Sequence, residues 1–329
     1  MNIGVIGSGS WGMALSCLLV ENTHKVKVWS RNENEVNEIN RFHKLDRYLP
    51  GIELPEDIVA TGDILEAIKD TNMIVLAVPS IAIRECTKMI AENLDDQIIV
   101  SVAKGIEEKS LKRLSEVIRE EVPKKQRIAI LSGPSHAEEV ARKLPTVVAV
   151  GADDEETREM VSSAFMNEYF RVYPNSDVIG VEVGGAVKNV IALCAGISDG
   201  LGFGDNAKAG LITRGLAEIT RLGVKMGGRP ETFYGLTGVG DLVVTCASKH
   251  SRNHKAGEFL GQGYSLAEAI KKVNMVVEGV NAAKAVRELG RKYEVEMPIT
   301  EQACLVLFKG KEPRIAVLEL MGRDKKNEI

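Results

Sequence analysis

Lys188 is the side chain in this sequence best suited to proton transfer, because small residues surround it. It lies in the segment GGAVKNV (184–190), where helical spacing places Gly184, Lys188 and Ala192 on one face. Small side chains there let another surface come close, and an ammonium held in a cleft can protonate a developing oxyanion. The alternative is an exposed lysine on a solvated helix face.

Two later segments place polar side chains beside turns. GLTGVGDL (235–242) is a glycine-rich loop that ends in Asp241 before a helix, and Thr245 follows one turn later. Asp241 is suited to orienting a lysine, although capping a helix is the commonest role of such a residue. SRN (251–253) presents a hydroxyl, a guanidinium and an amide ahead of a helix, which suits a phosphate dianion. A basic surface loop explains that segment equally well.

A glycine-rich turn follows the first predicted strand. Residues 7–12 (GSGSWG) match G-x-G-x-x-G, whose glycines permit a tight turn, approach of a pyrophosphate to the backbone, and close helix–strand contact. The helix that begins there presents free N–H groups and partial positive charge to phosphates. The pattern predicts a dinucleotide cofactor held by Gly7, Gly9, Ser10, Trp11 and Gly12.

The second strand ends at VWSRN (28–32), where an NAD-selective site usually carries an acid for the ribose 2′-hydroxyl. Here the sequence offers Ser30 and Arg31, and a carboxylate that would repel a 2′-phosphate is missing before Glu33. Because arginine pairs well with phosphate, NADP is favoured over NAD. A solvated arginine at a helix start is the other interpretation of Arg31.

The elements that position these residues differ between the two halves of the chain. To about residue 177, short apolar runs alternate with helical patterns. Strands are predicted at 2–6, 25–29, 73–78, 98–101, 128–131 and 146–150, and helices at 13–20, 33–41, 81–93, 110–122 and 136–142. This alternation predicts a parallel, doubly wound sheet. Ligands bind outside the carboxyl ends of such strands, which here carry AVPS (77–80), SVAKGI (101–106) and LSGPSHA (131–137).

After residue 178 helical periodicity takes over, as at Ile212, Leu216 and Ile219. Helices are predicted at 184–198, 254–261, 266–272, 280–289, 300–308 and 314–321. We therefore expect an α/β protein with a Rossmann-like N-terminal domain (1–177) and an all-α C-terminal domain (178–329) that share a cleft.

Composition narrows the class of protein. The 329 residues favour two domains, and 44% hydrophobic with 27% charged residues is typical of a globular protein. A net charge of −4 argues against a nucleic acid partner. Five scattered cysteines indicate a reducing compartment and no zinc or other metal site. The most apolar stretch (181–201) contains Glu182, Lys188 and Asp199, so we expect no membrane span. With no targeting signal at the N-terminus, a cytoplasmic location is expected.

Together these motifs strongly resemble the bacterial-type NAD(P)-dependent glycerol-3-phosphate dehydrogenases. The similarity runs in order along nearly the whole chain and is carried by GSGSWG (7–12), AVP (77–79), AKGIE (103–107), LSGPSHAEE (131–139), FRVY (170–173), GGAVKNVIA (184–192), ITRGLAE (212–218), GLTGVGDL (235–242), SRN (251–253), VVEG (276–279) and MPIT (297–300).

The resemblance implies reversible reduction of dihydroxyacetone phosphate to glycerol 3-phosphate for glycerophospholipid synthesis, with NADP or NAD as cofactor, in a homodimer. The implied cofactor contacts are Ser10, Trp11, Arg31, Lys104, Ala137, Arg252, Val276 and Glu278. The implied substrate contacts are Lys104, Gly133, Ser135, Lys188, Asp241, Ser251, Arg252 and Asn253, with Asn189 and Thr245 beside them. Lys188 is implied to accept the proton in the oxidation direction.

The resemblance places the ammonium groups of Lys104 and Lys188 in one cleft, where they repel each other. That repulsion and desolvation are expected to lower the pKa of Lys188 from about 10.4, while Asp241 orients the lysine and partly offsets the change. Two rival functions stay open at this point. One is a related two-domain dehydrogenase for a keto acid or hydroxyacyl substrate, since a carboxylate also suits the Arg252 region. The other is a dinucleotide sensor without catalysis.

Overall fold

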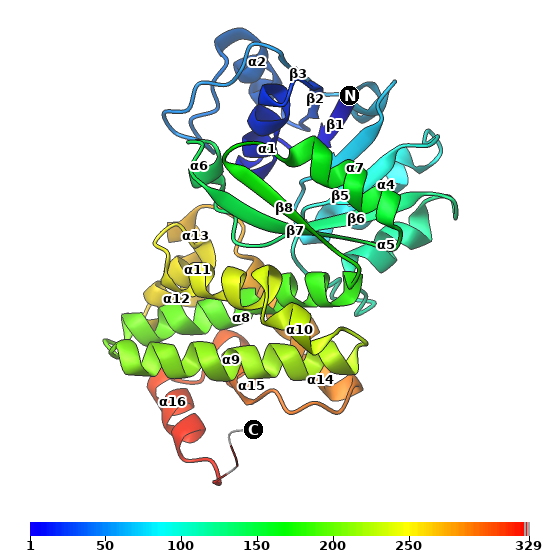
Figure 1. Cartoon of the computed structure of the whole chain (residues 1–329). Coiled ribbons are helices and arrows are strands. Elements are labelled where there is room, and N and C mark those ends of the chain that lie inside the picture. Colours follow the sequence, from blue (N-terminus) through cyan, green and yellow to red (C-terminus); the bar gives the residue numbers. More distant parts are fainter. Residues whose placement is uncertain (326, 328–329) are drawn as a thin grey trace.

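One eight-stranded sheet occupies the first half of the chain (Figure 1). The computed structural model describes residues 1–325 and residue 327. The strands are β1 (Asn2–Ile6), β2 (Lys25–Trp29), β3 (Ile58–Thr61), β4 (Met73–Leu76), β5 (Ile98–Ser101), β6 (Arg127–Ser132), β7 (Thr146–Ala152) and β8 (Phe170–Asn175). Their order is β3-β2-β1-β4-β5-β6-β7-β8, and β1 to β6 are parallel. The predicted parallel sheet is confirmed for most of its width, but at one edge β7 runs antiparallel to β6, and β8 pairs parallel to β7.

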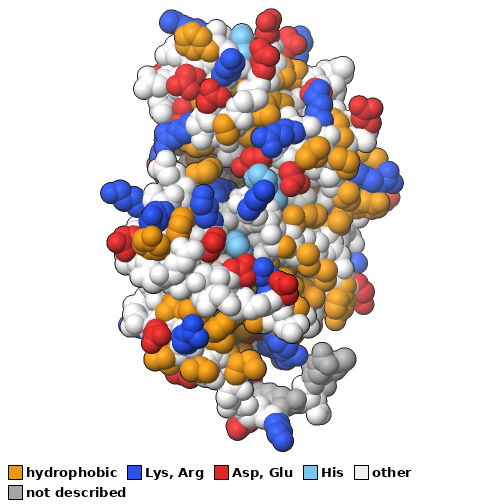
Figure 2. All heavy atoms as spheres, turned by 90° about the vertical axis from the view of Figure 1, so that its left-hand side faces the viewer, with side chains coloured by type: hydrophobic (Ala, Val, Ile, Leu, Met, Phe, Trp, Pro, Cys, Tyr) orange, Lys and Arg blue, Asp and Glu red, His pale blue; other side chains and the backbone are white. Residues whose placement is uncertain are grey.

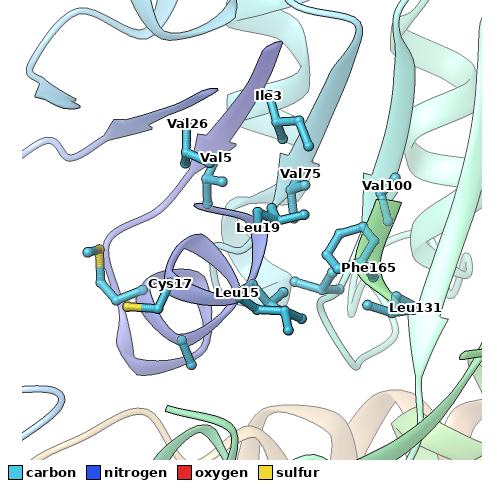
Figure 3. Close-up of a cluster of buried hydrophobic side chains, with 14 of the residues drawn as sticks. Ile3, Val5, Leu15, Cys17, Leu19, Val26, Val75, Val100, Leu131 and Phe165 are labelled. Carbon is cyan, nitrogen blue, oxygen red and sulfur yellow. The ribbon is translucent and has the colours of Figure 1, made fainter. Parts of the chain in front are cut away.

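Helices cover both faces of this sheet, which confirms the doubly wound arrangement. They are α1 (Ser10–Glu21), α2 (Glu33–Phe42), α3 (Ile64–Ile68), α4 (Ile83–Ala91), α5 (Leu114–Glu121), α6 (Ala137–Val140) and α7 (Glu155–Phe165), with a 3-10 turn η1 (Ser80–Ala82). Successive residues of β1 point to opposite faces: Val5 packs with Leu15 of α1 in one apolar cluster (Figure 3), and Ile6 packs in the other. The central strands are therefore buried on both sides.

Sequence patterns did not predict β3, β8, α3 and α7. Both missed strands lie at the edges of the sheet, where one side of each strand has no partner and the apolar pattern weakens. In β8, Tyr173 is exposed and Pro174 follows it, and proline is accepted in a sheet mainly at such an edge. Edge strands thus carry less of the signal that identified the buried ones.

The second half consists of helices around α8 (Figure 1). They are α8 (Val178–Gly200), α9 (Asp205–Lys225), α10 (Pro230–Phe233), α11 (Asp241–Ala247), α12 (Arg252–Gly261), α13 (Leu266–Val273), α14 (Glu278–Lys292), α15 (Pro298–Lys309) and α16 (Pro313–Met321), with a π-helical turn η2 (Leu236–Gly240). Helix α12 crosses α8 at very short range, since a Cβ on Gly257 would lie 2.0 Å from the carbonyl oxygen of Leu193. This crossing holds the start of α12 beside the middle of α8.

Helix α8 is the only helix of the described residues long and apolar enough to cross a membrane by length and composition. The expectation that its polar residues would exclude it from that class was wrong. However, 83% of its most apolar window is buried inside the protein. Burial against the helices around it accounts for its apolar composition.

The two halves are joined by buried contacts as well as by the chain. The carboxylate of Glu182 on α8 accepts hydrogen bonds from the backbone N–H of Ser115 (2.8 Å) and from the guanidinium of Arg113 (2.5 Å), at the start of α5. Val181 packs into an apolar cluster of the sheet, and Ile106 packs into that of the helices. These contacts fix the carboxyl ends of the strands against α8.

Candidate active site

A buried cluster of two lysines and one aspartate lies where the halves meet. Asp241, at the start of α11, is 1% exposed, and its Oδ2 accepts a hydrogen bond from Nζ of Lys104 (2.6 Å), in the loop after β5. Its Oδ1 accepts from Nζ of Lys188, and that ammonium also donates to Oγ1 of Thr245 (2.6 Å). The structure thus brings together four residues that the sequence analysis had singled out separately.

The small residues around Lys188 allow the close approach that the sequence predicted. A Cβ on Gly184 would lie 2.5 Å from the carbonyl oxygen of Thr237 in η2. A Cβ on Gly185 would lie 2.7 Å from Oγ of Ser132, at the end of β6. Larger side chains at these two positions would separate α8 from both surfaces, and Lys188 would then lose its position against Asp241.

Burial and the neighbouring charges set the protonation of the cluster. Burial lowers the pKa of Lys188 to about 8; Asp241 opposes the change and Lys104 adds to it. Burial by itself would raise the pKa of Asp241, but the two ammonium groups outweigh it and the pKa is lowered. An ionised aspartate therefore holds a lysine that can exchange its proton near neutral pH.

We predict that the pH dependence of the reaction has opposite signs in its two directions. With Lys188 as the proton donor of a carbonyl reduction, the ammonium form is the active one, and kcat/KM is expected to fall as pH rises through about 8. In the direction of alcohol oxidation the neutral amine is the active form, and kcat/KM is expected to rise through the same pKa. Initial rates from pH 6 to 10 in both directions check this. If kcat/KM changed with pH in the same sense in both directions, another group would be titrating.

The loop after β6 adds oxygen atoms to the cluster. The carbonyl oxygen of Gly133 accepts hydrogen bonds from Nζ of Lys104 (2.9 Å) and Oγ of Ser135 (2.9 Å). His136 follows, its ring centroid 5.9 Å from that of His250, and its buried Nε2 has no partner among the described residues. The sequence analysis gave His136 no role, because a lone histidine carried no pattern.

The glycine-rich turn has the geometry that a dinucleotide phosphate needs. Gly7 adopts φ +118°, and a Cβ on it would lie 2.7 Å from the carbonyl oxygen of Ala77; a Cβ on Gly12 would lie 2.0 Å from that of Gly7. Gly9 faces open space. No side chain caps the N-terminus of α1 and its first turn has no acid, so its N–H groups are free for an anion. The residues present therefore fit the phosphates of NAD or NADP.

A chain of contacts leads from this turn to the lysine cluster. Gly7 touches Ala77, three residues before Ser80, and Gly105 packs so closely on Ser80 that a Cβ would lie 2.5 Å from that of the serine. Lys104, next to Gly105, binds Asp241. Contacts between neighbouring segments therefore link the turn to the cluster.

Glu278 reaches this site from the helical half. Its carboxylate accepts hydrogen bonds from the backbone N–H (3.2 Å) and Oγ (2.7 Å) of Ser80. Burial raises the pKa of Glu278, and the bonds from Ser80 offset only part of that change. The sequence placed Ser80 in the strand-end segment AVPS (77–80) but indicated no separate role for it. Of the other expected cofactor contacts, Ala137 is buried at the start of α6 and Val276 is exposed just before α14.

The segment 251–253 begins α12, and its three side chains differ in their environments. Oγ of Ser251 caps the helix by accepting from the N–H of His254 (3.2 Å). The Asn253 amide is occupied, since its Nδ2 donates to Oδ1 of Asn189 (2.9 Å) and its Oδ1 accepts from the N–H of Gly279 (2.8 Å). The exposed Arg252 forms no hydrogen bond or ion pair with the rest of the described chain. Arg252 is thus the side chain of this segment available to an anion.

The structure corrects one prediction about the end of β2. A carboxylate is present there: Glu35 of α2 turns back and accepts hydrogen bonds from Ser30 and from Ser8 of the glycine-rich turn. The sequence concealed it because the residue lies six positions beyond the strand end, on the next helix. Arg31 is exposed beside this group.

Basic side chains gather on one face of the molecule. Figure 2 shows Lys and Arg side chains at mid-height of the face on the left of Figure 1, with His side chains among them. Within the described residues, no group of three or more His, Cys, Asp or Glu side chains is placed to hold a metal ion.

Comparisons with known proteins decide the family. The model of the NAD-dependent glycerol-3-phosphate dehydrogenase N-terminus matches residues 2–158, and that of the C-terminus matches residues 177–318. The chain belongs to the NAD-dependent glycerol-3-phosphate dehydrogenase family. Membership confirms the α/β fold with a helical second half, the oxidoreductase class and the dependence on NAD or NADP that the sequence predicted.

Individual members of this glycerol-3-phosphate dehydrogenase family are similar over nearly their whole length. A glycerol-3-phosphate dehydrogenase [NAD(P)+] of Lysinibacillus sphaericus is 56% identical, over 99% of this chain and 97% of that protein. One of Fusobacterium nucleatum is 55% identical, over 100% and 99%. The crystal structure of the enzyme of Coxiella burnetii superposes with a TM-score of 0.94 at 38% identity, over 98% of this chain and 99% of that chain.

Proposed function

We propose that this dehydrogenase reduces dihydroxyacetone phosphate reversibly to glycerol 3-phosphate, with Lys188 as the proton donor. The observation that carries the proposal is the buried Lys188–Asp241–Lys104 cluster, which contacts link to the phosphate-binding turn. When bound, the nicotinamide supplies the hydride that forms the new C–H bond at C2. The electron pair of the carbonyl bond moves to the C2 oxygen, which takes a proton from the Lys188 ammonium.

The other residues of the cluster prepare that proton transfer. Asp241 holds both ammonium groups at fixed positions, and Thr245 accepts a hydrogen bond from Lys188. Lys104 stabilises negative charge on the oxygen from the sheet side, and Gly133 fixes it through a hydrogen bond. The amine left on Lys188 regains a proton from solvent, which its lowered pKa allows at neutral pH.

Other residues bind the phosphate of the substrate and the dinucleotide cofactor. The free guanidinium of Arg252 binds the phosphate, and Ser251 and Asn189 line the same region. Asn253 acts by orienting Asn189, since its own amide is engaged. The phosphates of NAD or NADP lie against Gly7, Gly9, Ser10, Trp11 and Gly12. The remaining cofactor contacts are Arg31, Lys104, Ala137, Arg252, Val276 and Glu278.

A spectrophotometric assay tests the function directly. We expect oxidation of NADPH or NADH with dihydroxyacetone phosphate, and formation of glycerol 3-phosphate in equal amount. Keto acids of similar size are expected to react at least about a hundredfold more slowly, because a carboxylate offers Arg252 less charge and fewer oxygen atoms than a phosphate dianion does. Comparable rates with a keto acid would favour the rival substrate class, and cofactor binding without turnover would favour a sensor.

We further infer a division into domains at residues 1–177 and 178–329, a homodimer and a cytoplasmic location. The boundary is supported by the end of β8 at Asn175 and the start of α8 at Val178. The location is supported by five free cysteines, which suit a reducing compartment. The homodimer rests on the resemblance to the family.

A further inference from the structure

A buried carboxylate lies behind the phosphate-binding turn. Oε2 of Glu35 accepts hydrogen bonds from Oγ of Ser8 (2.6 Å) and Oγ of Ser30 (2.7 Å). Its Oε1 accepts from Nδ2 of Asn32 (3.3 Å) and the hydroxyl of Tyr48 (3.3 Å). Glu35 is only 8% exposed, and Ser8 and Ser30 are 6% and 3% exposed. Four donors thus surround one carboxylate in a region closed to solvent.

The position of this carboxylate relates it to the cofactor. Ser8 lies inside the GSGSWG turn, and Ser30 directly follows β2. In dinucleotide-binding folds the adenosine ribose lies between these two points, and a residue at the end of β2 recognises its 2′ position. Glu35 bridges the two points from α2, so it lies behind the atoms that would touch the ribose.

The charge of Glu35 has no partner of opposite sign. Among the described residues no lysine, arginine or histidine forms an ion pair with it, and the four groups that bind it are neutral donors. Burial by itself would raise its pKa, but those hydrogen bonds outweigh burial and lower it. Glu35 therefore remains a fixed negative charge at neutral pH.

The hydrogen-bond directions matter as much as the charge. The hydroxyl protons of Ser8 and Ser30 are both donated to Glu35, so each oxygen can only accept from any further group. Ser30 already accepts from the N–H of Asn32 (3.2 Å), which leaves it one lone pair. Acceptors suit the hydroxyl donors of a ribose diol. A 2′-phosphate offers only acceptors, and it would meet both these oxygens and the charge behind them.

We propose that Glu35 is a specificity-determining residue, which favours NAD over NADP by orienting Ser8 and Ser30 as acceptors and by repelling a 2′-phosphate. It is a positioning residue that acts through the two serines. Arg31, exposed beside the site, opposes it by attracting the phosphate, and Arg47 lies 5.3 Å from the ring of Tyr48. The balance between these charges sets the ratio of the affinities for NAD and NADP. The inference rests on the proposed function for the place where the dinucleotide binds.

Dissociation constants for NADH and NADPH, measured by fluorescence titration, test the proposal. In Glu35→Gln the amide oxygen keeps the bonds from Ser8 and Ser30 while the charge is lost. We expect the NADPH-to-NADH ratio of dissociation constants to fall at least about tenfold, the size expected for removing one charge near a phosphate. Glu38→Gln is the matched control, since it removes an exposed carboxylate from the same helix, and its ratio is expected to stay unchanged. A ratio within twofold of the parent enzyme in folded Glu35→Gln overturns the proposal.

Two further variants keep the test decisive if Glu35→Gln does not fold. Ser30→Ala removes an acceptor for the diol, so NADH binding is expected to weaken several-fold more than NADPH binding; equal losses overturn the proposal. Arg31→Asp is expected to move the ratio the opposite way, toward NADH, and an unaltered ratio contradicts the opposing role of Arg31. Failure of the proposed function is distinguishable, because it would appear as absent turnover of dihydroxyacetone phosphate with both nicotinamides.

Discussion

Replacement of Lys188 by alanine is expected to lower kcat by about 10²- to 10⁴-fold, the usual contribution of a positioned proton donor. Lys188 is 5% exposed and its ammonium is bound to Asp241 and Thr245, so the proton donor is held in a fixed position. The dissociation constant for NADPH is expected to change by less than about threefold. Steady-state kinetics and fluorescence titration measure both quantities.

The control for this variant separates chemistry from packing. Lys188→Met fills the space of the lysine stem with an unbranched apolar chain, so it removes the proton and leaves no cavity. We expect it to be as inactive as the alanine variant. Lys225→Ala, at the exposed end of α9, is expected to keep normal turnover. Near-normal kcat in either Lys188 variant would remove that residue from the mechanism.

Replacement of Arg252 by alanine is expected to raise KM for dihydroxyacetone phosphate by about a hundredfold, since hydrogen bonds to charged groups contribute about 1.5–3 kcal/mol each. Arg252 begins α12, is exposed, and forms no hydrogen bond or ion pair with other described residues, although its charge acts on Glu278. Its guanidinium is therefore available to the ligand. Its removal is expected to leave the unfolding temperature within a few degrees of the parent enzyme. Initial rates over a range of substrate concentration give KM and kcat.

Two variants sharpen the interpretation of Arg252. Arg252→Lys keeps the charge but loses the planar fork, so KM is expected to rise by an intermediate factor. Lys255→Ala removes an exposed cation one turn later on the same helix and is expected to leave KM unaltered. If KM in Arg252→Ala equals that of the parent enzyme, the phosphate binds elsewhere.

Much of the fold follows from local patterns. Buried strands are visible as uninterrupted apolar runs, as in β4, and helices are visible because apolar residues recur with the helical period, as in α9. The phosphate-binding turn was equally visible, because its glycines meet a local steric requirement. Lys188 stood out for the same reason, since the small residues beside it permit the observed approach of η2.

Other features depend on contacts between distant residues. The reversal of β7 and β8 at one edge of the sheet leaves no local trace, because a strand has the same side-chain period in either direction. The edge strands β3 and β8 escaped prediction because they are covered on fewer sides. The hydrogen bonds of Asn253 with Asn189 and Gly279 also depend on the tertiary structure, since the sequence showed only an amide beside an arginine.

The sequence by itself determined which groups were available: a glycine-rich turn for dinucleotide phosphates, two lysines, an aspartate and an arginine, on elements of known type. Only the tertiary structure decided which of them meet. Lys104 and Asp241 are 137 positions apart, and no local pattern encodes their hydrogen bond. The contacts of Glu35 were equally hidden from the sequence, although the residues are close in the chain. Its carboxylate reaches Ser8 and Ser30 only because of how α2 packs against the sheet.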